Sequence, residues 1–486
     1  IYLNKFYMPE ESVAHKTTRT SLWAGIEKIA TMGVQFVVSI IIARLLSPSD
    51  YGIIAMLSIF VEIASSVVQC GFGNALIRKQ DCKSIDYCTA FYFNFAVSIV
   101  MYGVLFVIAP FVASFYKMEL LCPVLRVCGL TLVIQALTLV QYTILSKNLE
   151  AKKQARIAIV GALFSGAIGL LMAYMGCGVW SLVGQQLSIG LVNVLLLWSS
   201  TSWLPQFEFS LDSMKYLWGF GSKMLLTGII SVTYRNIYSL VIGRYYNSSA
   251  LGLFNRGQSL AVQIPNITEA VFIKNSLPIF SQIQNDNARL IKVYREYIKL
   301  ACFVTFPAVC LLSVLAEPLV RLVLTEKWLG CVVYIQIFAL TSFIGPANSI
   351  NLNLLQVFGR SDYTLYAEII KKSTGLLMVF SLITQGPLWL AIGSSCFNVF
   401  AYGVNLYYAK QLSGLRYKDQ INDVFPIFLC SGLMYLSVYA TIQLFDNSLV
   451  QIIIGSMVGL LSFFLFARYV FKLEQLNYIS KIRTKS

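Results

Sequence analysis

Long apolar runs follow one another along the whole chain, and short polar stretches separate them. A helix needs about 20 mostly apolar residues to cross the hydrocarbon core of a bilayer, and runs such as 95–115 and 449–467 are close to this length. The runs and the turn residues between them predict fourteen membrane-spanning helices, at residues 21–46, 50–73, 87–115, 120–146, 153–175, 178–199, 213–243, 249–275, 293–316, 329–357, 363–384, 387–409, 423–444 and 448–471. We therefore expect an all-α polytopic membrane protein.

The basic residues lie mostly in the connectors on one side of the predicted membrane. The two chain ends and the connectors on their side together hold about four times as many Lys and Arg residues as the opposite connectors. Cytoplasmic loops of membrane proteins carry such an excess, so we expect both ends in the cytoplasm. Residues 1–20 have neither a short apolar core nor a cleavage site, and we interpret them as a cytosolic leader rather than a cleaved signal peptide.

A fourteen-residue motif occurs twice in the chain. ARLLSPSDYGIIAM at 43–56 and GRYYNSSALGLFNR at 243–256 have Arg, Ser and Gly in the same register. The pattern LWxxxxK repeats at 22–28 and 217–223, and two further short matches follow in the same order. Six predicted helices separate the two copies of the motif, so both copies enter the membrane in the same direction. This arrangement indicates a parallel repeat.

The repeat predicts two lobes of six helices each, followed by two further helices. Paired repeats around a substrate site are the architecture of alternating-access transporters. The predicted domains are a leader at 1–20, an N-lobe at 21–199, a cytoplasmic linker at 200–212, a C-lobe at 213–409, helices thirteen and fourteen within 410–471, and a basic cytosolic tail at 472–486.

Composition supports a membrane protein and excludes other classes. Hydrophobic residues make up 57% of the 486 residues and charged residues 12%, which is about half the charge of a soluble protein. The net charge of +15 is spread over connectors, so we expect no nucleic-acid partner. The 11 cysteines lie mostly in apolar runs, so we expect neither a disulfide framework nor a metal site. No nucleotide-binding or hydrolase motif stands on a soluble segment, which excludes an ATPase.

The first two helices of each predicted lobe carry polar residues at helical spacing along one face. An ionisable group at the centre of a membrane helix costs at least ~2.5 kcal/mol, so it normally faces the bundle interior or water. We predict a water-filled, mostly cationic cavity between the lobes, with substrate contacts from Lys28, Gln35, Gln69, Lys223, Arg235, Arg256, Gln263 and Asn266. In the alternative interpretation, these charges pair with one another or extend to the membrane surface.

Two membrane-embedded carboxylates are candidates for ion coupling. Glu62 and Glu269 lie on the second helix of each predicted lobe, and the single histidine, His15, lies in the leader. Coupling to protons or sodium ions would therefore have to use these carboxylates. We expect no cofactor other than such an ion.

The sequence SLWAGIEKIATMGVQFVVSIIIARLLSPSDYGIIAM at 21–56, followed by GFGNALIRKQD at 71–81, resembles the bacterial polysaccharide flippases. It is similar in particular to the colanic-acid and lipopolysaccharide exporter branch of the multidrug/oligosaccharidyl-lipid/polysaccharide exporter superfamily. Many members of this family have an acidic residue at the position of Gln69. The resemblance therefore makes Glu62, which precedes Gln69 on the same face, the candidate for that role.

The resemblance implies that the protein moves an undecaprenyl-pyrophosphate-linked oligosaccharide from the cytoplasmic to the periplasmic leaflet of the bacterial inner membrane by alternating access. The oligosaccharide would be the repeat unit of an O-antigen, a capsule or an exopolysaccharide. The implied partners are this substrate, membrane lipids, and polysaccharide polymerase or assembly proteins.

Two other functions stay open at this point. A cation-coupled multidrug antiporter of the same superfamily would favour a more acidic cavity, whereas the polar faces hold four basic residues against Glu27, Glu62 and Glu269. Lys and Arg are the usual partners of phosphate groups, which favours the flippase. A membrane-embedded glycosyltransferase would need a sizeable periplasmic loop, and the longest predicted one, around 315–329, is short. We therefore expect a transporter and not an enzyme.

Overall fold

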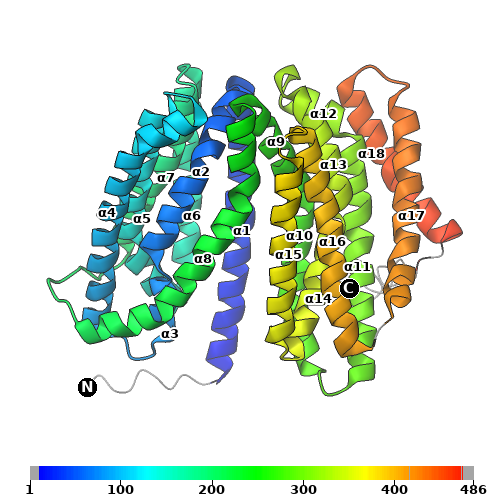
Figure 1. Ribbon diagram of the computed structural model, residues 1–486. Helices are drawn as coiled ribbons and strands as arrows, with labels where there is room; N and C mark the ends of the chain where they lie inside the picture. Colours follow the sequence, from blue (N-terminus) through cyan, green and yellow to red (C-terminus); the bar gives the residue numbers. More distant parts are fainter. Residues whose placement is uncertain (1–9, 415, 472, 474, 476–486) are drawn as a thin grey trace. The chain divides into compact units, whose positions relative to one another are not determined.

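The computed structural model describes residues 10–414, 416–471, 473 and 475, and these residues form helices joined by turns with no strand among them (Figure 1). They divide into two compact units, Ile1–Gly252 and Leu253–Ser486, which are described in turn. Residues 1–9 of the predicted leader lie outside the described residues. So does most of the predicted tail, of which only Leu473 and Gln475 are described.

The first unit contains eight helices among its described residues, and the beginning of a ninth. They are α1 (Glu10–Leu45), α2 (Pro48–Gln69), α3 (Phe72–Arg78), α4 (Ser84–Tyr116), α5 (Leu121–Lys147), α6 (Ala151–Tyr174), α7 (Val179–Ser200), α8 (Leu211–Tyr245) and the start of α9 (Ser248–Ala261). Buried side chains from α2, α4 and α5, among them Val68, Leu105 and Leu132, form one of its apolar cores.

Local sequence signals define the ends of α2. Ser47 caps the first turn by accepting a hydrogen bond from the Asp50 backbone, and the Asp50 carboxylate accepts one from the Ser47 backbone in return. Pro48 occupies the first turn, where its missing N–H has no intrahelical partner to lose. At the other end, Cys70 and Gly71 have left-handed backbone angles, with φ of 44° and 67°. The helix therefore stops there, and α3 begins in a new direction.

The two copies of the duplicated motif contact each other at the beginnings of α2 and α9. The Ser49 and Ser248 hydroxyl groups share a hydrogen bond of 2.6 Å. A Cβ atom added to Gly52 would overlap the Ser248 carbonyl oxygen, and a Cβ atom added to Gly252 would overlap the Pro48 carbonyl oxygen. Glycine at both positions therefore permits close approach of the two backbones.

The first unit includes α8, which packs against α2, α3 and α4. The sequence repeat predicts that residues 213–243 form the first helix of the C-lobe. The compact units and the predicted lobes therefore have different boundaries. The connector before α8 lies along the beginning of α4, because the Gln206 backbone N–H lies 3.4 Å from Cys88 Sγ and the Ser210 N–H donates to Thr89 Oγ1 at 3.0 Å.

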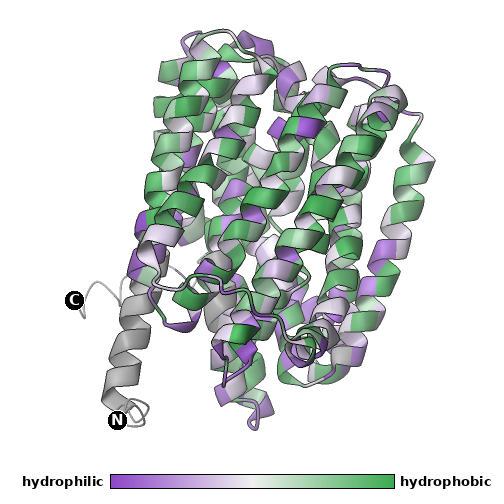
Figure 2. Ribbon diagram, turned by 90° about the vertical axis from the view of Figure 1, so that its left-hand side faces the viewer, coloured by the Kyte–Doolittle hydropathy of each residue, from purple (hydrophilic) through white to green (hydrophobic). Residues whose placement is uncertain are grey.

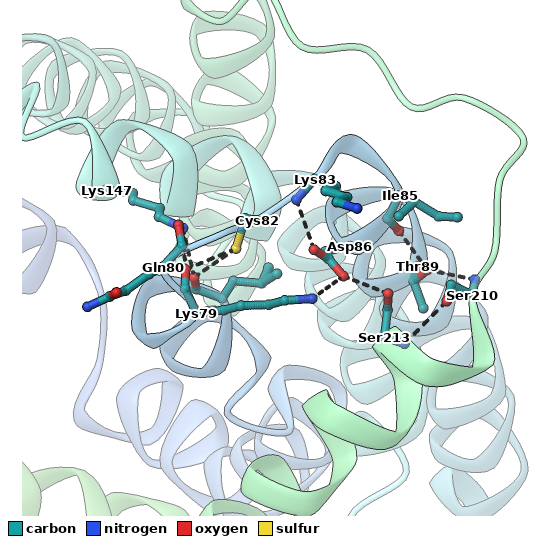
Figure 3. Close-up of polar contacts among 11 residues, drawn as sticks. Lys79, Gln80, Cys82, Lys83, Ile85, Asp86, Thr89, Lys147, Ser210 and Ser213 are labelled. Atoms are coloured by element: carbon teal, nitrogen blue, oxygen red, sulfur yellow. Dashed lines mark hydrogen bonds and ion pairs between the residues drawn. The ribbon is translucent and has the colours of Figure 1, made fainter. Parts of the chain in front are cut away.

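The Asp86 carboxylate joins the beginnings of α4 and α8 (Figure 3). It is 2.7 Å from Lys79 Nζ, and it accepts hydrogen bonds from the Ser213 hydroxyl at 2.6 Å and from the Lys83 backbone at 2.9 Å. Beside it, Lys147 Nζ donates to the backbone carbonyl groups at the end of α3, including that of Lys79 at 2.5 Å. These contacts tie α3, α4, α5 and α8 together at one end of the unit.

The second unit contains the rest of the helices among the described residues. They are the remainder of α9, then α10 (Gln263–Gln282), α11 (Asn287–Val314), α12 (Ala316–Val323), η1 (Glu326–Cys331), α13 (Val332–Ser342), α14 (Gly345–Val357), α15 (Ser361–Leu382), α16 (Pro387–Ser413), α17 (Tyr417–Ile442), α18 (Ser448–Leu465) and η2 (Phe466–Val470). One core of the unit joins α10, α11, α14 and α17 through buried side chains such as Phe280, Tyr294, Ile350 and Ile427.

Two of the predicted spans in the second unit, 249–275 and 329–357, are interrupted well inside their length. A turn at Val262 separates α9 from α10, three residues before Pro265, which cannot donate a backbone hydrogen bond. A second turn, at 343–344, separates α13 from α14, and Gly345 and Pro346 follow it. Pro within a helix and neighbouring Gly are common causes of such breaks.

The length and composition of the helices agree with the predicted class. Eleven helices among the described residues are long and apolar enough to cross a membrane. The other predicted spans fall on α1, whose apolar part is Ala30–Leu45, on the interrupted pair α9–α10, and on α15. Figure 2 shows that hydrophobic residues dominate the helices in view. The prediction of an all-α polytopic membrane protein is therefore confirmed.

Candidate functional site

The polar face predicted for the second helix is present on α2, and its side chains contact neighbouring helices of the first unit. Ser65 Oγ donates to Gln135 Oε1 on α5 at 2.6 Å. Gln69 Nε2 donates to Ser65 Oγ at 3.2 Å, and Gln69 lines a cavity of about 290 Å³ together with residues of α3 and α5. Gln135 is not among the predicted site residues, because it lies on a helix for which no polar face was predicted.

Glu62 on α2 and Arg235 on α8 form an ion pair. Arg235 Nη2 lies 2.6 Å from Glu62 Oε2, and Asn236 Nδ2 donates to the same oxygen at 3.0 Å. The Asn236 side-chain oxygen in turn accepts a hydrogen bond of 3.0 Å from the Ser58 hydroxyl. Arg235, a predicted substrate contact, is thus paired with Glu62, a predicted ion-coupling residue. The alternative interpretation, in which the charges on the polar faces pair with one another, expects such a contact.

The Arg235–Glu62 pair remains accessible. The Arg235 side chain is 68% exposed and the Glu62 side chain 39%. Arg235 lies ten residues before the end of α8, about 15 Å along the helix axis, so it is well inside a helix that is long and apolar enough to cross the membrane. A charged group at such a depth normally faces water or protein rather than lipid. We therefore expect this face of the first unit to be hydrated.

The exposed guanidinium group of Arg235 can still bind an anion. A guanidinium has five N–H donors arranged in a planar fork, which matches carboxylate and phosphate oxygens. Glu62 contacts one nitrogen of this fork and fixes the direction of the group. The other predicted contacts of the first unit, Lys28, Gln35 and Lys223, have exposed side chains on α1 and α8.

Arg256 has a different environment from the other predicted contacts. Its side chain is 8% exposed, and its guanidinium carbon lies 5.9 Å from the centre of the Trp328 ring, which is itself fully buried. An Arg side chain over an aromatic face gains a cation–π interaction. Arg256 is therefore packed inside the second unit rather than placed on an exposed face, and this position suits a structural role.

A polar cavity of about 240 Å³ lies in the second unit. It includes two predicted residues, Asn266 and Glu269, whereas the predicted contact Gln263 is not among its lining residues. Side chains of α10, α13, α14 and α16 contribute its polar groups, which belong to Asn266, Glu269, Thr341, Ser342, Asn348 and Asn398.

The carboxylate of Glu269 is held beside the first turn of α14. It is half-buried and accepts a hydrogen bond from the Ser349 hydroxyl. A Cβ atom added to Gly345 would lie only 2.9 Å from Glu269 Oε1, so glycine provides the space for this carboxylate. Asn405 Nδ2 donates to Asn348 Oδ1 at 2.7 Å and orients that side chain at the edge of the cavity. Asn348, Asn398 and Thr341 were missed because they lie outside the predicted polar faces.

A helical bundle with membrane-spanning lengths, an accessible ion pair and an interior polar cavity defines a polytopic membrane transporter. The chain belongs to the family described as polysaccharide biosynthesis protein, which matches residues 41–333. The family resemblance predicted from the sequence is therefore confirmed, and the chain is a transporter rather than an enzyme.

Similar proteins cover most of the chain. The teichuronic acid biosynthesis protein TuaB of Bacillus subtilis is 22% identical over 447 residues, which are 90% of this chain and 91% of TuaB. The succinoglycan biosynthesis transport protein ExoT of Rhizobium meliloti is 25% identical over 385 residues, 78% of each chain. The solved structure of the lipid II flippase MurJ in an inward closed conformation matches with a TM-score of 0.74 at 13% identity, covering 92% of this chain and 98% of MurJ. The similarity to MurJ shows that the two proteins share a fold.

Proposed function

We propose that the protein flips an undecaprenyl-pyrophosphate-linked oligosaccharide, the repeat unit of an O-antigen, capsule or exopolysaccharide, across the bacterial inner membrane. The observation that carries this proposal is the accessible Arg235 on a membrane-spanning helix, held in place by Glu62. The names of the similar proteins agree with it, since they concern teichuronic acid, succinoglycan transport and lipid II.

The chemistry of the pyrophosphate group fits this site. A pyrophosphate that leaves water loses strong hydration, and fixed positive charge with several donors can replace part of it. The Arg235 fork provides such donors, and Glu62 balances the Arg235 charge when no substrate is bound. The exposed Lys28 and Lys223 side chains add positive charge on the same unit. We propose transport from the cytoplasmic to the periplasmic leaflet by alternating access, with both chain ends in the cytoplasm.

One observation favours a second candidate, a cation-coupled antiporter for small molecules. The polar cavity of the second unit contains the Glu269 carboxylate and no basic side chain among its lining residues, so it suits a positively charged ligand. The two candidates differ in the charge of the molecule that is moved, which transport assays distinguish directly.

Purified protein in liposomes tests the proposal. Undecaprenyl-pyrophosphate oligosaccharide with a labelled sugar is placed in the inner leaflet, and its appearance outside is followed by a membrane-impermeant oxidant. We expect wild-type protein to accelerate flipping and Arg235→Ala to remove most of the acceleration. Arg235→Lys should restore only part of it, because a single ammonium group cannot make the forked contact.

Arg321 provides the matched control for Arg235. It forms an exposed pair with Glu317 at 2.8 Å on α12, and its side chain is 45% exposed. Arg321→Ala should therefore flip the lipid at the wild-type rate. The flippase proposal is wrong if the wild-type protein does not flip the lipid but exchanges cationic drugs for protons or sodium ions.

A further inference from the structure

Another polar cavity of the second unit, of about 340 Å³, is lined by residues of α12, α17 and α18 (Figure 1). In the packing of the unit, α18 contacts both α12 and α17. The lining includes Glu317 of α12 and Asp446 of the turn between α17 and α18. The sequence predicts the connectors 317–328 and 445–447 on the side opposite both chain ends. We therefore expect this α12–α18 cavity to open to the periplasm.

Two tyrosine rings of α17 line the α12–α18 cavity. Tyr435 and Tyr439 lie one helical turn apart, and their rings are nearly parallel, with 6.5 Å between the ring centroids and 7° between the planes. Tyr439 is 49% exposed, so its ring is accessible to a ligand. The face of an aromatic ring carries partial negative charge, which attracts the polarised C–H groups of a sugar ring. The tyrosines thus provide a surface that suits an uncharged sugar.

Three carboxamide side chains line the same cavity, those of Gln336, Gln443 and Gln451. Gln451 Nε2 donates to the Phe445 carbonyl oxygen at 2.6 Å and to the Ile442 carbonyl oxygen at 3.2 Å. These bonds fix the side chain and use its nitrogen, and its oxygen stays available as an acceptor. A carboxamide provides both donors and an acceptor, so it matches sugar hydroxyl groups, which also donate and accept.

The charges around the α12–α18 cavity disfavour an anionic ligand. Glu317 and Arg321 pair with each other at 2.8 Å, and Asp446 adds a further carboxylate, so the three groups together carry one negative charge. Contact with lipid explains only part of the lining. Tyrosines are common at membrane interfaces, but carboxamides and carboxylates need water or hydrogen-bonding partners. A neutral ligand rich in hydroxyl groups satisfies both the rings and the polar groups.

We propose that the α12–α18 cavity binds neutral sugar residues of an oligosaccharide. Tyr439 packs against a sugar ring, and Gln443, Gln451 and Asp446 form hydrogen bonds with its hydroxyl groups. A cavity of about 340 Å³ holds about ten waters of ~30 Å³ each, and a bound sugar ring displaces several of them. The assignment of this sugar to the transported molecule, after it has crossed the membrane, rests on the proposed function. Contact at that stage follows flipping, so the flipping rate does not depend on it.

Saturation-transfer difference NMR tests the proposal on the purified full-length protein in phosphatidylcholine nanodiscs, because maltoside detergents contain sugars themselves. The probe is the lipid-free repeat-unit oligosaccharide, released by mild acid from the lipid-linked precursors of the native cells. We expect saturable transfer to protons of its neutral sugars. Tyr439→Ala should weaken binding at least about fivefold, because the aromatic surface is lost. Tyr439→Phe keeps the ring and should retain most of the binding.

Tyr407 provides the matched control for Tyr439. It lies on α16, is also 49% exposed, and is not among the residues that line the cavity, so Tyr407→Ala should bind the oligosaccharide like the wild type. The proposal is overturned if the wild type shows no saturable binding or if Tyr439→Ala binds normally. It is also overturned if the cation tetraphenylphosphonium binds through Tyr439 and the oligosaccharide does not.

The probe contains neither lipid nor pyrophosphate, so its binding is independent of flipping. A protein that binds the oligosaccharide through Tyr439 but does not flip the lipid-linked form would support the α12–α18 cavity and contradict the proposed function alone.

Discussion

At the scale of single residues, the sequence identified charged positions but not their partners. Helical spacing placed Glu62 and Arg235 on polar faces, and the structure joins them in one ion pair. Asn236, which contacts the same carboxylate, follows Arg235 directly and so lies outside the predicted face by about 100° of helical rotation. Exposed ion pairs contribute only ~0–1 kcal/mol, so we do not expect this pair to stabilise the fold appreciably.

Arg235 and Arg256 should therefore respond differently to removal of the side chain. Arg256→Ala leaves a hole against the buried Trp328 ring, and we expect a loss of about 2–4 kcal/mol in the free energy of unfolding. Arg235→Ala should change this free energy by less than about 1 kcal/mol. Thermal unfolding of both purified variants, followed by tryptophan fluorescence, measures the difference. Equal stability of the two variants would contradict the positions described for these side chains.

At the scale of helices, the sequence predicted the spans well, whereas the division into two lobes of six helices stays a prediction. Every predicted span lies on a helix or an interrupted helix, because long apolar runs leave few alternatives. The predicted repeat relates residues 213–243 to the first predicted helix. A similarity between two segments does not specify their packing partners, and α8 packs against α2 in the first unit. The break before α14 was not predicted, although Gly345–Pro346 was a visible signal for it.

The contacts of Asp86 should hold α8 in place. Asp86 is 2% exposed. Its carboxylate pairs with Lys79 and accepts hydrogen bonds from the Ser213 hydroxyl and the Lys83 backbone N–H. Asp86→Asn keeps the shape but removes the charge opposite Lys79. Breaking a well-buried pair costs ~3–5 kcal/mol, and we expect about 2 kcal/mol here because Lys79 is 27% exposed. Chemical or thermal unfolding of the purified variant checks this value.

Asp81 is a suitable control for Asp86 because it is an exposed residue five positions earlier, in the loop that precedes α4. Asp81→Asn should unfold at the wild-type temperature. If Asp86→Asn also unfolds at that temperature, the network does not stabilise the contact between α4 and α8.

At the scale of the whole molecule, the class and the family follow from features that extend over much of the chain. The hydrophobic runs, the duplicated motif and the basic connectors can all be recognised in the amino-acid sequence. The family match covers residues 41–333. The sites could not be predicted equally well, since the cavity of the second unit joins residues from 262 to 401. Contacts between positions so distant in sequence depend on the packing of the helices.

The orientation in the membrane is testable on the whole chain. The excess of basic residues predicts that reporter fusions after residues 155 and 415 lie in the cytoplasm. Fusions after residues 247 and 330 should report the periplasm. Alkaline phosphatase and fluorescent-protein activities at the four positions measure this pattern, and reversal at any two of them would contradict the assignment.

The contact between the two duplicated motifs restricts how their sequences can change during evolution. A side chain at either Gly52 or Gly252 would collide with a backbone carbonyl group of the other copy. Substitution at one position therefore cannot be relieved by a smaller residue at the other, because both are already glycine. Each glycine therefore meets a steric requirement of its own, because the atom that a side chain would meet is a backbone carbonyl oxygen of the other copy.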